Sequence, residues 1–252
     1  MSRPAPEDVR GAWDRLAAFW DEEVEAGRTW QRRLIAPAVE ALLDLSPGER
    51  VLELGAGNGT FARRMAELGA DVVATDFSEP MLERARSHGG KIEYRLVDAT
   101  DAAALRAIGE PGGFDAAVAN MAVMDMAEID PMVREVRRLI REGGRFVLSL
   151  LHPAFNSGDV TLITEITDDE RGVRRTHAVK IARYTDERPM QGVGVEDQPV
   201  VHWYFHRTLT TLLGAFFGGG WILDGIDEPV DTEGDGMFAE VPGVLVLRFR
   251  PA

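Results

Sequence analysis

Three glycines at alternate positions follow an apolar segment that begins at residue 51. Residues 51–59 read VLELGAGNG and lead directly into a stretch with the apolar spacing of an amphipathic helix. Glycine tolerates the backbone angles of a tight strand-to-helix turn and leaves room for a ligand beside the backbone. The N–H groups that begin the next helix direct partial positive charge toward such a ligand. The sequence therefore predicts a βα unit that binds a small polar molecule at its turn.

The spacing of these glycines distinguishes between two kinds of nucleotide site. The dinucleotide pattern is G-x-G-x-x-G, and counted from Gly55 its last glycine would fall at position 60, which is Thr60. The third glycine is instead Gly59, and an acid, Glu53, stands two residues before the first glycine. An acid followed by G-x-G-x-G resembles the first motif of class I S-adenosylmethionine-dependent methyltransferases.

Acidic residues also end the next two predicted strands. The segment 71–76 ends in Asp76, and a carboxylate at the end of a second parallel strand can accept both ribose hydroxyls of a nucleoside. The segment 92–97 is followed by Asp98 and Ala99, where the resemblance implies a side-chain acceptor and a backbone N–H for an adenine ring. From about residue 48 to 152 the chain resembles the class I methyltransferase core, and within it the ubiquinone/menaquinone-methyltransferase-like enzymes of the small-molecule branch.

The resemblance implies that S-adenosylmethionine is the cofactor and S-adenosylhomocysteine its product. It implies that Glu53 contacts the methionine amino group, and Trp30, near a helix start, is a candidate lid over the methyl donor. The residues that we expect at the cofactor site are Trp30, Glu53, Gly55, Ala56, Gly57, Asn58, Gly59, Asp76, Phe77, Met81, Asp98, Ala99, Asn120, Met121, Ala122 and Asp125.

Each of these motifs also has a purely structural explanation. The three glycines could form an ordinary tight βα turn, although two acids at strand ends argue against that explanation. Asp98 could cap a helix that begins near Asp101. Asp125 could orient a substrate, or belong to a short helix face.

Strands alternate with helical segments over most of the chain, which predicts an α/β fold with a doubly wound, Rossmann-like sheet. The resemblance implies seven strands in the order 3-2-1-4-5-7-6, the last of them antiparallel. We expect one compact domain with three parts: an N-terminal helical lid (1–45), a core (46–151 and 203–252), and a β-rich cap insertion after the fifth strand (152–202) that folds over the carboxyl ends of the strands.

Composition bears on the partners of the protein. The 28 Lys and Arg residues against 42 Asp and Glu give a formal charge of −14, which disfavours a nucleic-acid partner. The chain has no cysteine, so disulfides and thiolate metal sites are excluded, and we expect no metal. The longest uncharged run, 208–223, is interrupted by glycines and too short to span a bilayer. We expect a cytoplasmic protein, monomeric or homodimeric, that contacts no membrane.

Methyl transfer is an in-line displacement, so an enzyme must mainly align the acceptor with the methyl group and exclude water. A hydroxyl acceptor also needs a base. The candidates are the following histidines and tyrosines, for each of which ordinary packing is the alternative: His152, Tyr184, His202, Tyr204 and His206. His152 is the first choice, because the expected topology places it beside the methyl-donor pocket.

Three functions remain open from the sequence. The leading hypothesis is a methyltransferase of a small organic acceptor. The second is a nucleic-acid or protein methyltransferase; the charge disfavours it, and residues 120–123 read NMAV where enzymes that methylate base amino groups carry Asn/Asp-Pro-Pro-aromatic. The third is a non-catalytic protein that binds S-adenosylmethionine or S-adenosylhomocysteine. A dehydrogenase is a distant fourth.

Overall fold

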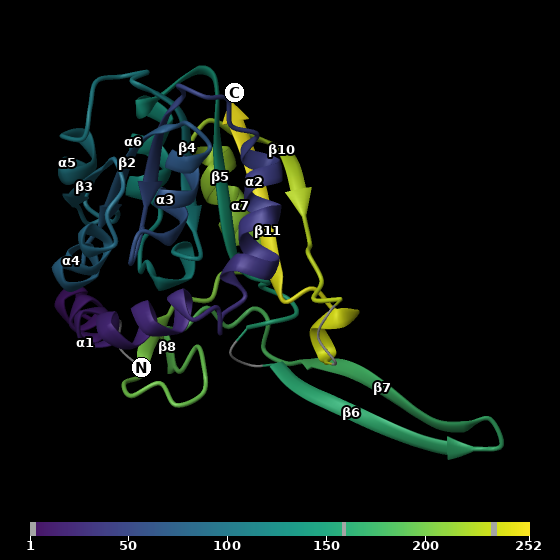
Figure 1. Cartoon of the computed structure of the whole chain (residues 1–252). Helices are drawn as coiled ribbons and strands as arrows, with labels where there is room; N and C mark the ends of the chain where they lie inside the picture. The colour runs from purple at the N-terminus through teal and green to yellow at the C-terminus, as the bar shows by residue number, and fades with distance from the viewer. Residues whose placement is uncertain (1–3, 158–159, 233–235) are drawn as a thin grey trace.

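The computed structural model of the chain describes residues 4–157, 160–232 and 236–252. Its centre is a mixed seven-stranded sheet in the order β10-β11-β5-β4-β1-β2-β3 (Figure 1). The strands are β1 (Arg50–Leu54), β2 (Asp71–Asp76), β3 (Ile92–Leu96), β4 (Phe114–Asn120), β5 (Ile140–Leu151), β10 (Trp221–Asp227) and β11 (Val244–Pro251). β1 to β5 pair in parallel, whereas β11 is antiparallel to both β5 and β10. This arrangement confirms the predicted sheet, including the order and the antiparallel last strand.

Helices cover both faces of the sheet, as the alternating pattern predicts. They are α3 (Thr60–Glu67), α4 (Glu79–Ser87), α5 (Ala102–Arg106), α6 (Asp130–Leu139) and α7 (Leu209–Gly218), together with the short η2 (Val123–Asp125) and η3 (Met237–Ala239). One core cluster joins β4 and β5 to α5, α6 and α7, and the other joins β1 and β2 to α2 and α3. The core thus fixes the strand ends, from which the predicted site residues project.

Of the N-terminal helices, the first lies across one end of the sheet, and the last packs on a face of the sheet against β5 and β11 (Figure 1). These helices are α1 (Pro6–Glu25), the π-helical turn η1 (Gln31–Ile35) and α2 (Ala36–Leu43). In Figure 1, α1 runs below the carboxyl ends of the parallel strands, which is the edge where open α/β sheets bind ligands.

The predicted insertion contains two separate hairpins. β6 (Val160–Asp169) and β7 (Gly172–Ile181) form a two-stranded sheet that projects away from the body, whereas β8 (Met190–Gly192) and β9 (His202–Tyr204) pair beside α1 (Figure 1). Only the second hairpin lies where a cap over the strand ends was expected. The division of the chain into lid, core and cap stays a prediction.

A search of the described residues for a membrane-spanning helix found none with the necessary length and apolarity.

Candidate functional site

A cavity of about 660 Å³ lies between the carboxyl ends of the strands and α1. All the predicted cofactor residues except Gly59 line it. Further lining residues come from segments that sequence reasoning did not assign to the site, among them Pro6, Val9, Trp13, Trp20, Val193 and Phe238. The cavity therefore has a polar half at the glycine turn and an apolar, aromatic half under α1.

The three glycines of the turn have different roles. Each has a positive φ, between 55° and 73°. A Cβ on Gly55 would lie 2.5 Å from Cβ of Ala122, and one on Gly59 would lie 2.4 Å from the Tyr94 hydroxyl oxygen, so both permit close packing. A Cβ on Gly57 would meet no atom within 4 Å. The backbone at Gly57 therefore faces open space, whereas Gly59 packs against Tyr94 and does not line the cavity.

Asp76 holds the glycine turn in place. Its Oδ2 accepts from the Gly57 N–H at 2.8 Å, and its Oδ1 accepts from the Ser78 N–H at 2.9 Å. Burial raises the pKa of Asp76 to about 6, although these backbone N–H groups oppose the shift. Because the Gly57 N–H is already bonded to a carboxylate, it is not free to bind a pyrophosphate, which argues further against a dinucleotide.

Glu53 is a buried acid without a partner on one oxygen. The side chain lies at the floor of the cavity, and its Oε2 makes no hydrogen bond. Burial raises the pKa of Glu53 to about 8, and the negative charge of Asp76 adds to this shift. A buried acceptor of this kind has a high desolvation cost unless a cation or a hydrogen-bond donor occupies the cavity. The site therefore fits a ligand that carries an ammonium group.

Asp98 does not cap the following helix. α5 is capped by Asp101, whose carboxylate accepts from the N–H groups of Ala103 and Ala104 at 2.8 and 3.2 Å. Asp98 instead accepts from the backbone N–H and the hydroxyl of Thr100 through Oδ1. The capping alternative for Asp98 is therefore wrong, and its carboxylate lines the cavity next to Ala99.

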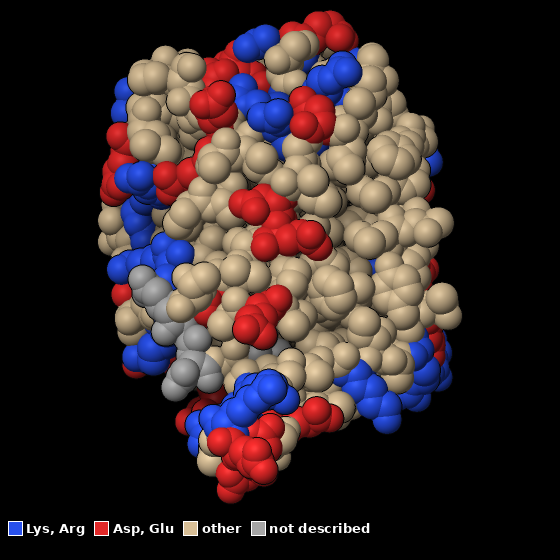
Figure 2. Space-filling view, turned by 90° about the vertical axis from the view of Figure 1, so that its right-hand side faces the viewer, with Lys and Arg blue, Asp and Glu red and all other residues tan. Residues whose placement is uncertain are grey.

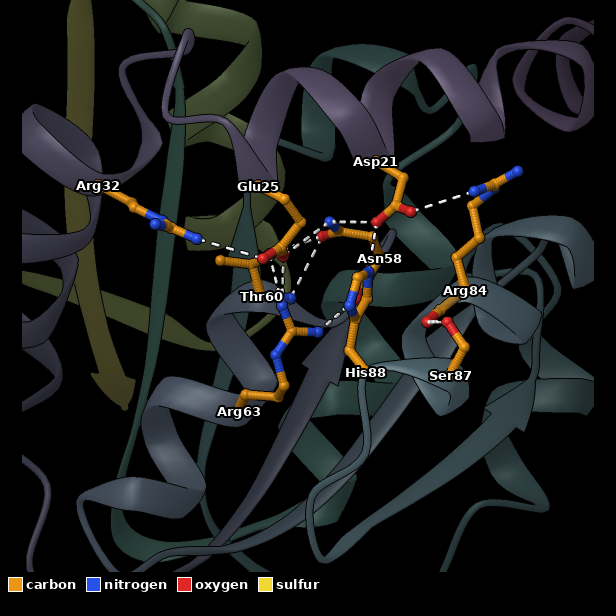
Figure 3. Close-up of polar contacts among 9 residues, drawn as sticks. All are labelled: Asp21, Glu25, Arg32, Asn58, Thr60, Arg63, Arg84, Ser87 and His88. Carbon is orange, nitrogen blue, oxygen red and sulfur yellow. Dashed lines mark hydrogen bonds and ion pairs between the residues drawn. The ribbon is translucent and has the colours of Figure 1, made fainter.

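Asn58 connects the glycine turn to α1 (Figure 3). Its Nδ2 donates to Asp21 at 3.0 Å and to Glu25 at 3.3 Å, and its Oδ1 accepts from Thr60. Asp21 and Glu25, one helical turn apart, could be recognised in the sequence as a pair, but nothing there identifies their partner.

Arginines and a histidine complete this polar cluster. Arg63 pairs with Glu25, Arg84 lies 3.1 Å from Asp21, and His88 lies 2.6 Å from Asp21. Burial favours a higher pKa for Asp21, but its hydrogen bonds with Asn58, His88 and Arg84 outweigh burial and lower it. Asp21, Glu25 and His88 are close enough to ligate a metal. Since the arginines already neutralise the carboxylates, the geometry assigns the cluster to holding α1 in place.

The apolar half of the cavity is built from aromatic rings. The Trp13 ring lies 5.9 Å from Trp20 and 5.0 Å from His202 between centroids, and Trp30 meets Phe238 edge-on at 4.9 Å. The indole N–H groups of Trp13 and Trp20 are buried and have no partner. Their spacing of seven residues on α1 indicates a shared face, a pattern that suits core packing equally well.

Two of the predicted catalytic residues, His202 and Tyr204, lie near Asp125, a residue that lines the cavity. The Nδ1 of His202 accepts from the Gln198 amide at 3.1 Å, so Nε2 carries the proton and points toward Oδ1 of Asp125 at 3.9 Å. Burial lowers the pKa of His202 to about 4 and raises the pKa of Asp125 well above its usual range. Burial, and next the charge of Asp125, raise the pKa of Tyr204.

None of the five catalytic candidates is among the residues that line the cavity, and the remaining three have partners elsewhere. The Nδ1 of His152 accepts from the N–H groups of Ala154 and Phe155, and its Nε2 lies 2.9 Å from Glu228. Burial lowers the pKa of His152, although the hydrogen bond with Glu228 opposes the shift.

His206 and Tyr184 join the insertion to α7. The Nε2 of His206 donates to the Tyr184 carbonyl at 2.7 Å, and the Tyr184 hydroxyl accepts from the Leu209 N–H at 2.7 Å. Catalytic roles for all five residues stay a prediction, and the geometry favours His202.

This chain is similar to known proteins. Residues 52–148 match the family described as a methyltransferase domain. The demethylmenaquinone methyltransferase of Beutenbergia cavernae is 32% identical over 144 residues, which are 57% of this chain and 58% of that protein. The ubiquinone biosynthesis O-methyltransferase of Xanthomonas oryzae pv. oryzae is 35% identical over 118 residues, 45% of this chain and 47% of that protein. The chain thus matches about half of the length of these relatives.

A solved structure extends the likeness over most of the chain. The S-adenosylmethionine-dependent methyltransferase from Mesorhizobium loti superposes with a TM-score of 0.66 and 29% identity, covering 85% of this chain and 96% of that one. Residues 52–148 therefore form a methyltransferase domain, and the fold around them is that of S-adenosylmethionine-dependent methyltransferases.

Proposed function

We propose that this protein transfers a methyl group from S-adenosylmethionine to a small, ring-containing acceptor of the quinol or phenol type. The observation that carries the proposal is the single cavity in which a carboxylate-lined half meets an aromatic half. Two matched relatives are named for menaquinone and ubiquinone methylation, which supports an apolar ring as acceptor.

The charge of the cavity supports a cationic methyl donor. Arg28 is the one Lys or Arg among the described lining residues, and its guanidinium is paired with Glu22 and Glu23. The other charged lining residues are all carboxylates: Glu53, Asp76, Asp98 and Asp125. When bound, S-adenosylmethionine supplies an electrophilic methyl on a sulfonium.

Each carboxylate has a separate binding role in this proposal. Glu53, whose Oε2 lacks a partner, would hold the ammonium group. Asp76 would accept the ribose hydroxyls with the lone pairs that Gly57 and Ser78 leave unused, and Asp98 would accept from the adenine amino group.

Asp125 and His202 serve the acceptor. The unpartnered Oδ1 of Asp125 is the atom that would accept the proton of an acceptor hydroxyl, and the Nε2–H of His202 points toward the same atom. Trp13 and Trp20 supply an apolar wall against which an aromatic ring can pack, and their indole N–H groups can donate to ring oxygens. In-line geometry then depends on how firmly this wall holds the ring.

The test is an acceptor screen with the full chain and S-adenosylmethionine, in which S-adenosylhomocysteine release is measured. Hydroxylated naphthoquinols and phenols are expected to give product. Amines, a transfer RNA and a histone-type peptide are tested as alternative acceptors. Methylation of the RNA or the peptide would refute the small-molecule proposal.

Calorimetry separates cofactor binding from catalysis. S-Adenosylmethionine and S-adenosylhomocysteine should bind at micromolar levels, whereas NAD and NADP should not bind. Firm binding with no product from any acceptor would favour the non-catalytic binding protein. Tight binding of a nicotinamide dinucleotide alone would refute the cofactor assignment.

A further inference from the structure

The β6–β7 hairpin, hereafter the arm (residues 160–181), extends away from the rest of the molecule (Figure 1). Its ten residue pairs, from Val160 with Ile181 to Asp169 with Gly172, make it about 33 Å long. At its base β7 packs near η3. A two-stranded sheet without a covering layer is only marginally stable in water. The arm therefore needs a surface to pack against.

One face of the arm carries its exposed large apolar side chains, together with Thr164, Asp168, Arg175 and His177. Directly paired residues of an antiparallel ladder share a face, so alternate pairs place the following side chains together: Val160, Leu162, Ile166, Val173, Val179 and Ile181. Leu162, Ile166, Val173 and Ile181 are 53%, 65%, 68% and 43% exposed. These four side chains expose roughly 400 Å² of apolar surface, a patch of the size that marks interaction sites on soluble proteins.

The arm is electrically neutral in an acidic protein. It contains four acids (Glu165, Asp168, Asp169, Glu170) and four bases (Arg171, Arg174, Arg175, Lys180), a net charge of 4 − 4 = 0. The whole chain has a net charge of −14, so the excess of negative charge lies outside the arm. The arm can therefore approach an acidic body without net repulsion.

The body offers a complementary surface beside the arm. β10 ends the sheet order, so its outer edge has no neighbouring strand in the described part of the chain. Ile222 and Ile226 on β10 are exposed, and the acids Asp224, Asp227 and Glu228 lie on or next to the same strand. Figure 2 views this side: charges of both signs cluster at the arm tip, and the surface above has few charges, mostly acidic in its centre.

We propose that this protein forms a two-fold dimer in which the arm of each copy packs its apolar face on the β10 surface of the other. Arg175, the one base of β7 on the apolar face, then lies near the acids of β10, which adds a charge contact to the apolar area. A closed two-fold pair uses both surfaces of each chain.

The areas are consistent with a stable dimer. One arm face of roughly 400 Å² is too small alone, because stable interfaces bury about 800 Å² per partner. Each copy both inserts an arm and receives one, so its total reaches about that value. This inference does not depend on the acceptor or the chemistry of the cavity.

Light scattering during size-exclusion chromatography tests the proposal on the full chain. At roughly 10–100 µM the protein should run at twice the chain mass of 27.7 kDa. The double variant Ile166→Glu/Val173→Glu places charges on the apolar face and should run as a monomer, with the dissociation constant of the dimer raised at least 100-fold. The control Thr167→Glu/Thr176→Glu adds the same charges to the opposite face and should stay dimeric.

A second readout uses the absence of cysteine from the chain. The single variants Ile166→Cys and Thr167→Cys each carry one thiol, on opposite faces of the arm. Maleimide labelling of Ile166→Cys should slow at least tenfold as protein concentration rises, and labelling of Thr167→Cys should not.

Two results would overturn the proposal: a wild-type monomer at 100 µM, or a dimer that persists in Ile166→Glu/Val173→Glu. Circular dichroism of each variant shows whether the sheet is intact. A wild-type monomer would assign the apolar face of the arm to a different protein.

Discussion

The side-chain amide of Asn58 donates to the carboxylate of Asp21 at 3.0 Å, joining the glycine turn to the first helix of the chain. The two residues are 37 positions apart. Since Asn58 also reaches Glu25, one amide fixes α1 against the carboxyl end of the sheet. The helix that covers the cavity is thus held by the loop that forms its polar floor.

We predict that Asn58→Asp lowers the melting temperature and weakens binding of S-adenosylhomocysteine at least tenfold. The new carboxylate would face Asp21 and Glu25, and like charges at hydrogen-bond distance repel. Asn58→Ala, which removes the bonds without adding charge, should have the smaller effect. Raising the salt concentration should partly restore Asn58→Asp. Equal losses in the two variants at every salt concentration would contradict this account.

Glu53→Gln should remove a pH dependence from the ligand-free protein. The pKa of Glu53 in the folded state, about 8, lies above its ordinary value of 4.5. Its contribution to stability is therefore complete below pH 4.5 and is lost as the pH rises through about 8. The wild-type melting temperature should fall more steeply over this range than that of Glu53→Gln, as measured by differential scanning fluorimetry. Parallel pH profiles would disprove the assignment.

Binding of the methyl donor should show the opposite trend at Glu53. An ammonium group favours the carboxylate, so wild-type affinity should rise with pH up to about 8, where Glu53 ionises without ligand. Glu53→Gln should bind more weakly and vary less with pH. Calorimetry at pH 6 and pH 8 measures both quantities, and a wild-type affinity that falls with pH would be the contrary result.

Asp76→Ala should weaken donor binding by about 2–4 kcal/mol, because two charge-assisted hydrogen bonds to the ribose are lost. It should also lower the melting temperature without ligand, since the N–H groups of Gly57 and Ser78 lose their acceptor. Asp76→Asn retains one oxygen acceptor and should lie between wild type and Asp76→Ala in both measurements. Unchanged donor affinity in Asp76→Ala would show that the ribose binds elsewhere.

Asp125→Asn removes the proposed base and His202→Ala removes the N–H group directed at it, so each should lower turnover by about 10²–10⁴-fold while donor affinity changes little. His152→Ala should mainly reduce stability, since His152 bonds Glu228 and two backbone N–H groups. The measurements are S-adenosylhomocysteine release and melting temperature for all three variants. A large loss of turnover in His152→Ala with an unchanged melting temperature would return the base role to His152.

The residues that line the polar half of the cavity can be predicted from the sequence because they belong to short local motifs. Glu53, Asp76 and Asp98 each stand at or beside the end of a parallel strand, and the ends of parallel strands meet at one edge of a sheet. Their positions in the cavity therefore follow from strand order. Trp13 and Trp20 are different, because a helical stripe of aromatics indicates a buried face without showing whether a core or a ligand covers it.

The direction of the arm is likewise beyond local patterns. The alternation in residues 160–181 predicts strands, and the structure confirms them. Whether a hairpin folds back over the site or extends outward depends on contacts at its base, and these involve η3, more than fifty residues later in the chain. The predicted cap thus combines one hairpin that reaches the site with another that points away.

One helix links both halves of the cavity. α1 contributes Trp13 and Trp20 to the aromatic wall, and Asp21 and Glu25 to the bonds with the glycine turn. A ligand in either half therefore acts on the position of the same rigid rod. By thermodynamic reciprocity, if a bound acceptor changes the affinity for the cofactor by some factor, a bound cofactor changes the affinity for the acceptor by the same factor. The affinity of an inhibitor that fills the aromatic half should accordingly differ between the protein with S-adenosylmethionine and the protein with S-adenosylhomocysteine. The ratio of the two inhibitor affinities measures how strongly α1 couples the two halves.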